Sequence, residues 1–398
     1  MSELPKTPLL DELEKGPWPS FVTEIKKAAK KNPMAKDELA QLEKSYEDKR
    51  GYWKHGGIVG VRGYGSGVIG RYSSLPDMFP NVANFHTVRV NSIAGFFYTS
   101  DAIKMMCDIW DKYGSGLTNF HGSTGDIILL GTNTENLEPV FAELSSRGWD
   151  LGGSGSAFRT PSCCVGPARC EWSNIDTLDI TYSITQEFQD ELHRPAFPYK
   201  FKVKTAGCAV DCIASIARAD LSIIGTWKGK IEIDQDAVKW YEKNGMDIQK
   251  EIVNYCPTKC MSYDGKTLKI EDEDCSRCMH CISKMTKALK PTGEKGATIL
   301  IGSKAPFVIG ATLSWVIIPF MKLEPPYQPL IDFVRKSLEY WDEYGKNRER
   351  IGELIIRRGM REYLEYVGLQ PDPRMVKEPR RDPFYFWKEE ELIPNSQL

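Results

Sequence analysis

Ten of the eleven cysteines gather in three short segments, and this clustering limits what the chain can fold around. Clustered thiols in a reducing compartment predict metal ligands or catalytic groups rather than disulfides. The first fifteen residues alternate acids and bases without an apolar segment, so we expect no signal peptide and a cytoplasmic protein. The three groups are Cys163, Cys164 and Cys170; Cys208 and Cys212; and Cys256, Cys260, Cys275, Cys278 and Cys281.

Length and charge narrow the class of protein further. The 398 residues are 41% hydrophobic and 27% charged, which predicts two or three globular domains. The net charge of −2 gives no electrostatic reason to expect nucleic acid or an anionic membrane as a partner. The longest uncharged stretch, Ala305–Met321, has 17 residues and two prolines, so it is shorter than the ~20 residues that span a bilayer. We therefore expect no membrane span.

The spacing of apolar residues predicts how the chain is organised. Strand-like segments (82–90 and 126–130) alternate with helical segments (100–114 and 135–147), which indicates an α/β unit. Helical periodicity returns over Tyr327–Val367 as a helix pair, and the Pro-rich last thirty residues are expected to wrap over a partner. We expect five parts: a helical N-terminal arm (1–50), an α/β half-domain (51–150), a domain built from 151–229 and 296–325, an acidic insert (230–295), and C-terminal helices with a tail (326–398).

The insert carries the most specific motif. Cys275-x2-Cys278-x2-Cys281 places three thiols within seven residues, and Cys256 lies nineteen residues upstream, followed by proline. A tight triplet with a remote Cys-Pro is typical of a [4Fe–4S] cluster of the bacterial ferredoxin type. Zinc sites usually pair two separated Cys-x2-Cys units, so zinc fits this spacing poorly. We predict one cluster bound by these four cysteines, with Cys260 as a bystander.

The remaining clustered cysteines have a rarer spacing. Cys164-x5-Cys170 is followed, 37 residues later, by Cys208-x3-Cys212. Residue types alone leave zinc or buried thiols open beside an iron–sulfur centre, although a metal centre of some kind is favoured.

With its surroundings, this second set resembles a known family. The spacing is similar to that of the sirohaem sulfite and nitrite reductases, and most closely to the alpha subunit of dissimilatory sulfite reductase. The resemblance implies an α+β sirohaem sulfite reductase fold: a ferredoxin-like α/β half, a sirohaem- and cluster-binding α/β domain, and an inserted bacterial-ferredoxin [4Fe–4S] domain. The segments that carry it are WKHGGIVGVRGYGSGVIGRY (53–72), GSGLTNFHGSTGDIILLGT (114–132), TPSCCVGPARCEW (160–172), FQDELHRPAFPYKFKVK (188–204), CSRCMHCISKM (275–285) and RERIGELI (348–355).

The resemblance implies roles for individual residues. A second [4Fe–4S] cluster would be held by Cys164, Cys170, Cys208 and Cys212, with Cys212 bridging it to the sirohaem iron. The carboxylates of sirohaem would be bound by Arg62, Arg71 and the loop His121, Gly122, Ser123, Thr124 and Gly125. The substrate oxyanion would be bound by Arg89, Arg159, Lys200 and Lys202. Lys200 and Lys202 are expected to alternate on a strand and to face the same side.

The implied function is a six-electron interconversion of sulfite and sulfide or protein-bound reduced sulfur. The implied partners are a beta subunit in an α2β2 assembly, a small sulfur-carrier protein with C-terminal cysteines, and an electron donor or acceptor chain. Residues 160–172 slightly favour the sulfur-oxidising direction. The alternatives are an iron–sulfur electron-transfer subunit without a catalytic haem, which the insert alone would support equally well, and a zinc-binding scaffold.

The sequence departs from the family pattern at four positions that matter for the expected pocket. Ala209 and Val210 replace a usual Pro-Asn pair between the last two cysteines, Ser66 replaces a glycine, and Phe158, with Ala157 before it, stands in place of a more polar pair. We expect these changes to affect loop rigidity and pocket polarity rather than the identity of the cofactors.

Overall fold

The computed structural model describes residues 3–92, 97–122, 124–305, 310–372 and 375. The chain forms two compact units, one of residues 1–160 and 188–200 and the other of residues 161–187 and 201–398. The finer division into five parts stays a prediction, and the tail expected to wrap over a partner lies outside the described residues. None of the helices in the described part of the chain combines the length and apolar character needed to cross a membrane.

The first unit begins with three helices: α1 (Pro8–Glu12), α2 (Phe21–Ala29) and α3 (Pro33–Glu47). Helix α3 starts at Pro33 because the Asn32 side chain accepts the backbone N–H groups of Met34 and Ala35 and Pro33 supplies a helical φ. The carboxylate of Glu43 in α3 accepts the N–H groups of Leu9 and Leu10, at the start of α1. The helices therefore share both an apolar core and a buried polar anchor.

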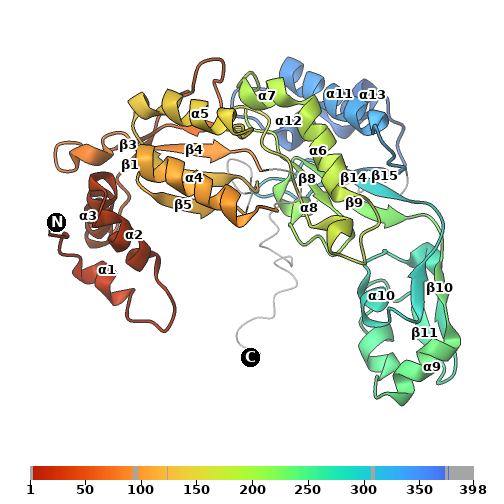
Figure 1. Ribbon diagram of the computed structural model, residues 1–398. Helices are drawn as coiled ribbons and strands as arrows, with labels where there is room; N and C mark the ends of the chain where they lie inside the picture. The colour runs from red at the N-terminus through yellow and green to blue at the C-terminus, as the bar shows by residue number, and fades with distance from the viewer. Residues whose placement is uncertain (1–2, 93–96, 123, 306–309, 373–374, 376–398) are drawn as a thin grey trace, which may run out of the picture. The chain divides into compact units, whose positions relative to one another are not determined.

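The rest of the first unit is an antiparallel sheet with two helices packed on it (Figure 1). The sheet order is β2 (Val68–Ile69), β4 (His86–Val90), β6 (Ile127–Thr132) and β5 (Leu117–Phe120), and the helices are α4 (Ser100–Tyr113) and α5 (Leu137–Ser146). A short ribbon of β1 (Trp53–His55) and β3 (Arg71–Ser73) and the helix α7 (Gln189–His193) complete the unit.

Two details of this unit differ from the sequence expectations. Helix α4 is capped by Thr99, whose hydroxyl accepts the N–H of Ala102, whereas the sequence suggests Ser100, the first residue of the expected helix, as the cap. The strand expected from residue 82 begins at His86, because residues 80–82 form a short 3-10 turn that starts with proline. Trp110 in α4 is fully buried, and its indole N–H donates to the Leu130 carbonyl, so it is a core residue.

The second unit is built on a mixed five-stranded sheet. Its order is β15 (Trp315–Met321), β14 (Lys295–Ile301), β9 (Leu221–Trp227), β8 (Val203–Ala206) and β7 (Ser162–Cys163). Strands β7, β8 and β9 are parallel, with Cys163 opposite Thr205, so the chain leaves β7 and β8 at the same edge. Cys164 follows β7 and Cys208 closely follows β8, which brings two cysteines from distant segments together. Helices α6 (Thr177–Glu187) and α8 (Ser215–Arg218) flank this edge.

Three helices follow the sheet, where a pair was expected: α11 (Gln328–Tyr344), α12 (Ile351–Arg358) and α13 (Met360–Val367). Gly359 separates the last two, because its φ of +105° interrupts the helical backbone. The buried rings of Tyr340 in α11 and Tyr363 in α13 pack edge to face, with centroids 5.4 Å apart, and join these two helices.

The cysteine-rich insert folds as a small lobe of the second unit (Figure 1). The insert contains two antiparallel ribbons, one of β10 (Ile231–Ile233) with β13 (Leu289–Pro291) and one of β11 (Met261–Tyr263) with β12 (Leu268–Ile270). It also contains helices α9 (Gln235–Lys243) and α10 (His280–Lys284) and the π-helical turn η4 (Gln249–Val253). Their apolar side chains form one core with the insert's cysteines.

Candidate iron–sulfur and anion-binding sites

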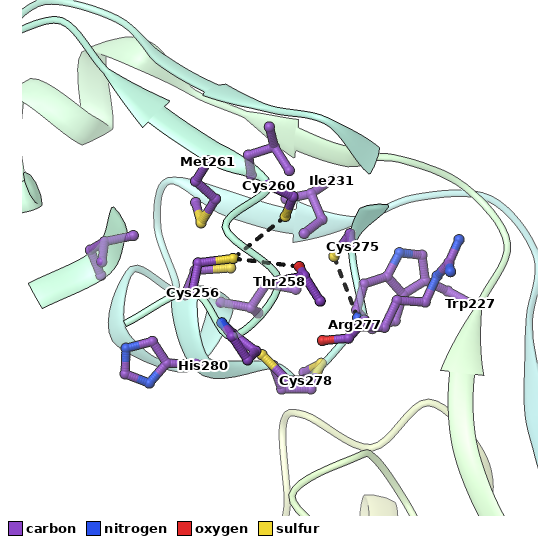
Figure 2. A pocket seen from close by; sticks show the side chains of 17 residues that line it. Trp227, Ile231, Cys256, Thr258, Cys260, Met261, Cys275, Arg277, Cys278 and His280 are labelled. Carbon is purple, nitrogen blue, oxygen red and sulfur yellow. Dashed lines mark hydrogen bonds between the residues drawn. The ribbon is translucent and has the colours of Figure 1, made fainter. Parts of the chain in front are cut away.

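The four cysteines predicted to hold the ferredoxin-type cluster line one pocket in the insert. Figure 2 shows Cys256, Cys275 and Cys278 around this pocket, and Cys281 also lines it. The pocket contains about 380 Å³ of space not filled by atoms, part of it open to solvent. Its remaining walls are largely apolar, with Trp227, Ile231, Ile252, Met261 and Ile282 among them.

The backbone between Cys275 and Cys281 has an unusual conformation and donates a hydrogen bond to a cysteine sulfur. Arg277 and Met279 both have positive φ values, +54° and +70°, which non-glycine residues adopt only where the surroundings hold them. The N–H of Arg277 donates to the sulfur of Cys275 at 3.4 Å. An N–H bond to a thiolate is one of the protein contacts that tune an iron–sulfur centre, so this backbone fits a cluster.

Burial favours the protonated form of two of the predicted cluster thiols, those of Cys275 and Cys281. It raises the pKa of Cys275, and it raises the pKa of Cys281 to about 12. Burial also acts on Cys256, but hydrogen bonds with Thr258 and Cys260 outweigh it and lower the pKa of this thiol. Cluster binding therefore has to displace protons from Cys275 and Cys281.

Cys260 lies closer to the predicted ligands than its description as a bystander suggests. Its sulfur is 3.5 Å from that of Cys256, both side chains are buried, and both face the pocket in Figure 2. Burial raises the pKa of Cys260 to about 11. The cysteine spacing contains no signal for this contact, because it depends on how the Cys256–Cys260 segment turns.

The second cysteine set is also brought together. The pKa of Cys208 is raised by burial and by the charges of Cys170, Cys212 and Cys164, which places the other three thiols near it. The N–H of Gly207 donates to the sulfur of Cys164 at 3.2 Å. Cys212 is exposed, whereas Cys208 is buried. All eleven cysteines lie in the described residues and carry free thiols.

The altered loop between Cys208 and Cys212 is held by Asp211. Its carboxylate accepts the backbone N–H groups of Ser215 and Ile216 at 2.8 and 3.0 Å and the Ser215 hydroxyl at 2.7 Å. These bonds hold the backbone that follows Cys212. Val210 is exposed beside them.

Neither cysteine set is arranged like a mononuclear metal site. In the part of the chain that the structure describes, no group of three or more His, Cys, Asp or Glu side chains is placed to hold a metal ion. The ligand sulfurs of a four-iron cluster lie further apart than those around a single metal ion, since each of the four thiolates binds a different iron. The pocket, the backbone N–H to sulfur bonds and the thiol-only donor sets fit such a cluster.

A buried arginine–aspartate pair lies in the first unit. Nη1 of Arg89 is 2.8 Å from Oδ2 of Asp126, which is fully buried, and Thr124 also donates its hydroxyl to this carboxylate. Burial raises the pKa of Asp126, and the charges of Arg89 and Arg159 oppose that rise. Nε of Arg89 is buried and has no hydrogen-bond partner. This atom is a donor that an anion can still use.

Further cations surround the pair. Burial and the nearby Arg89 charge lower the pKa of Arg71, whose Nη1 lies 2.6 Å from Nε2 of His55. Burial and Arg71 lower the pKa of His55, so this imidazole is neutral and can accept the hydrogen bond. The guanidinium groups of Arg71 and Arg159 therefore act electrostatically on the Arg89–Asp126 pair, and this positive field suits an anion.

The loop predicted to bind sirohaem is tied to the same carboxylate. The N–H of His121 donates to the Asp126 carbonyl, and Nδ1 of His121 lies 2.9 Å from the Thr124 hydroxyl. Gly125 closes this turn with a φ of +73°. Gly122 is exposed, and Ser123 lies outside the described residues. Arg62 is exposed, and no contact places it with Arg71 or Arg89 in the described structure.

The two predicted substrate lysines are not on a strand. Lys200 and Lys202 precede β8, which begins at Val203, and the boundary between the two units falls after Lys200. The expected alternation on one strand is therefore wrong, because the regular pairing starts one residue after Lys202.

Sequence reasoning overlooked Lys204, two residues further along. Its side chain is buried, and Nζ donates to the Ile213 carbonyl at 2.9 Å, next to Cys212. Burial lowers the pKa of this ammonium group. The alternation of Lys200, Lys202 and Lys204 in the sequence could have identified this residue.

Ser66 and Phe158, two departures from the family pattern, are fully buried. The Ser66 hydroxyl accepts the N–H of Ser154 at 2.6 Å, and the Phe158 ring stacks on Phe188 with centroids 5.3 Å apart. Their side chains pack within the first unit.

Comparisons with known proteins agree with this architecture. The nitrite and sulphite reductase 4Fe-4S domain matches residues 154–372, and the nitrite/sulfite reductase ferredoxin-like half domain matches residues 80–147. A chain in the crystal structure of dissimilatory sulfite reductase I has a TM-score of 0.89 and 49% identity, with 97% of this chain and 96% of that chain covered.

Two curated relatives extend over almost the whole chain. The dissimilatory-type sulfite reductase subunit alpha of Nitratidesulfovibrio vulgaris (strain Hildenborough) is 50% identical over 415 residues, which cover 97% of this chain and 95% of the relative. The protein of the same name from Allochromatium vinosum is 44% identical, with 95% and 93% covered. With these identities and this coverage, the chain belongs to the family of dissimilatory-type sulfite reductase alpha subunits.

Proposed function

We propose that this chain is the alpha subunit of a sirohaem sulfite reductase that interconverts sulfite and sulfide or protein-bound reduced sulfur by six-electron chemistry. The observation that carries the proposal is that the parallel strands β7 and β8 bring Cys164 and Cys208 to one edge of the second unit's sheet, where the N–H of Gly207 donates to the sulfur of Cys164. An electron-transfer subunit would need the cysteines of the insert, but it would have no use for this second set or for the arginine cluster.

The cofactors we propose are sirohaem and two [4Fe–4S] clusters. Cys256, Cys275, Cys278 and Cys281 would hold one cluster, and Cys164, Cys170, Cys208 and Cys212 the other, with Cys212 adjoining the sirohaem iron. Arg71, His121 and Thr124 would bind sirohaem carboxylates. When bound, these groups supply the electrons and the iron for the sulfur chemistry, and the protein supplies binding, orientation and charge.

The basic side chains would bind the sulfur oxyanion. Arg89, Arg159, Lys200 and Lys202 carry positive charges that attract sulfite and stabilise negative charge on its oxygens. Asp126 holds one Nη of Arg89, so the guanidinium plane is oriented while Nε remains available. The ammonium groups of the lysines can donate protons as the oxygens leave as water.

The partners and the compartment follow from the same proposal. The beta subunit would complete an α2β2 assembly, and a sulfur-carrier protein with C-terminal cysteines and an electron chain would serve it. Eleven free thiols favour a reducing compartment such as the cytoplasm. The direction, for which residues 160–172 slightly favour sulfur oxidation, is tested by comparing rates of sulfite reduction and sulfite formation in one preparation.

The first experiment is an optical spectrum of the anaerobically purified complex with its beta subunit, before and after sulfite is added. Sirohaem bands that shift with sulfite would support the proposal. Iron–sulfur absorption without sirohaem bands would refute it in favour of an electron-transfer subunit. Zinc without iron on elemental analysis would refute both.

A further inference from the structure

We infer that Asp220 and Arg350 are positioning residues for Lys202, and that their ion pair keeps the segment of this lysine in a conformation suited to binding the sulfur oxyanion. The inference rests on the proposed function, because it assigns a support to one of the proposed substrate cations. All three residues belong to the second unit.

The contacts form a continuous chain from a C-terminal helix to the backbone of Lys202. Arg350 donates through Nε to Oδ1 of Asp220 at 2.6 Å and through Nη2 to Oδ2 at 2.5 Å. The same Oδ2 accepts the backbone N–H of Lys202 at 2.7 Å. On the other side of this residue, the Lys202 carbonyl accepts the N–H of Leu221 at 3.0 Å. Both backbone groups of Lys202 are thereby held.

The ion pair is buried, which makes its geometry strict. The Asp220 side chain is 0% exposed and the Arg350 side chain 10%. A buried pair of this kind adds little net stability over an apolar contact, because both charges lose their hydration. Its role is to orient the groups it joins. The two hydrogen bonds from Arg350 fix the plane of the Asp220 carboxylate, and this carboxylate fixes the position of the Lys202 N–H.

Arg350 is itself held from two sides. It precedes α12, and the Glu353 carboxylate in the first turn of that helix accepts the N–H of Arg350 at 3.0 Å. The buried ammonium of Lys304 lies 3.0 Å from Glu353. The neighbouring Phe201 packs on Trp341 of α11, with ring centroids 5.8 Å apart. Arg350, through Asp220, and Trp341, through Phe201, therefore hold the backbone around Lys202 at two points.

Charge gives a second reason for the pair. Asp220 without Arg350 would leave an unpaired carboxylate hydrogen-bonded to the backbone of a residue that has to attract an anion. The guanidinium neutralises this carboxylate, so the negative charge of Asp220 does not offset the positive charge of Lys202. Removing Arg350 should thus weaken sulfite binding both by loosening the segment and by exposing it to a negative charge.

The test measures the sulfite dissociation constant from the shift of the sirohaem spectrum, in the purified complex with the beta subunit. Lys202→Met sets the size of the lysine's contribution. We expect Arg350→Met to raise the dissociation constant on the order of tenfold. In the Lys202→Met background the same change should add less than about twofold, because residues that act through one another are not additive.

Arg357→Met is the matched control. Arg357 lies in α12, the helix that Arg350 precedes, and makes a similar two-point ion pair to Glu349 at 2.7 and 2.9 Å, whereas the carboxylate that accepts the Lys202 N–H belongs to Asp220. We expect this variant to bind sulfite within about twofold of the parent protein. Asp220→Asn combined with Arg350→Met removes the unpaired charge and keeps the test available if the single change prevents folding. This double variant should bind sulfite more weakly than the parent protein and more tightly than Arg350→Met.

The outcomes separate the two proposals. Equal weakening by Arg350→Met with and without Lys202 would show a general structural role and overturn the inference. Unchanged affinity in Arg350→Met, while Lys202→Met binds poorly, would overturn the inference alone. Unchanged affinity in Lys202→Met would remove the substrate role of this lysine and the inference with it, and a complex without a sulfite-dependent spectrum would refute the proposed function.

Discussion

Replacement of Arg89 by methionine tests how the first unit tolerates a carboxylate in its interior. Asp126 is fully buried, and its 2.8 Å contact to Arg89 is the ion pair that balances its charge. Removing one partner of a buried pair leaves the other charge uncompensated, which costs ~3–5 kcal/mol. The Thr124 hydroxyl still donates to this carboxylate, so we expect a loss near the lower end, about 3 kcal/mol, at pH 8.

The loss should depend on pH with a definite sign. Burial already raises the pKa of Asp126 with Arg89 present, and the variant raises it further. A carboxyl whose folded pKa lies above its unfolded value of about 3.9 stabilises the fold at low pH and loses that contribution as the pH rises through the folded pKa. The stability deficit of Arg89→Met should therefore be small near pH 4 and grow toward pH 8.

Urea unfolding of the anaerobically purified protein, followed by circular dichroism at several pH values, measures this deficit. Adding Asp126→Asn to Arg89→Met should recover much of the lost stability at pH 8, since a neutral amide is left in place of a charge. A deficit that is the same at pH 5 and pH 8, or a double variant no more stable than Arg89→Met, would refute the electrostatic reasoning.

Three further predictions concern the cysteine sites and the N-terminal helices. Cys281→Ser should lower the iron content by about four atoms per chain, whereas Cys260→Ser should keep it, as measured by iron analysis; equal losses would make Cys260 a ligand. Asp211→Ala removes three hydrogen bonds that hold the Cys212 loop and should speed the bleaching of cluster absorbance in air, while a rate like that of the parent protein would show that the loop holds without them. Half-buried Glu38 has a buried, unpartnered Oε2 and a pKa raised by burial to about 8, so its stabilising contribution is lost as the pH rises from about 4.5 through 8. Glu38→Gln should raise the midpoint of thermal unfolding by roughly 2 °C or more at pH 8 and change it little at pH 5, and an equal change at both pH values would contradict this.

The candidate site divides into parts that the sequence predicts and parts that it does not. The spacing of Cys275, Cys278 and Cys281 indicates a cluster because three ligands within seven residues must face one small centre. The contact of Cys260 with Cys256 has no counterpart in the spacing. The strand expected for Lys200 and Lys202 is wrong, because alternation predicts a strand but not where its hydrogen-bonded pairing begins.

The sequence by itself determined the family, and it predicted the strand–helix alternation of the first unit and the cysteines proposed as ligands, since these depend on local spacing and on residue identity. The tertiary structure decided which distant charges meet. Asp126 is 37 residues from Arg89, and Asp220 is 130 residues from Arg350. Such pairs leave no periodic pattern in the sequence. Two buried charges pair where sheet edges and helix ends come together in space, and this arrangement follows from the packing of the whole unit.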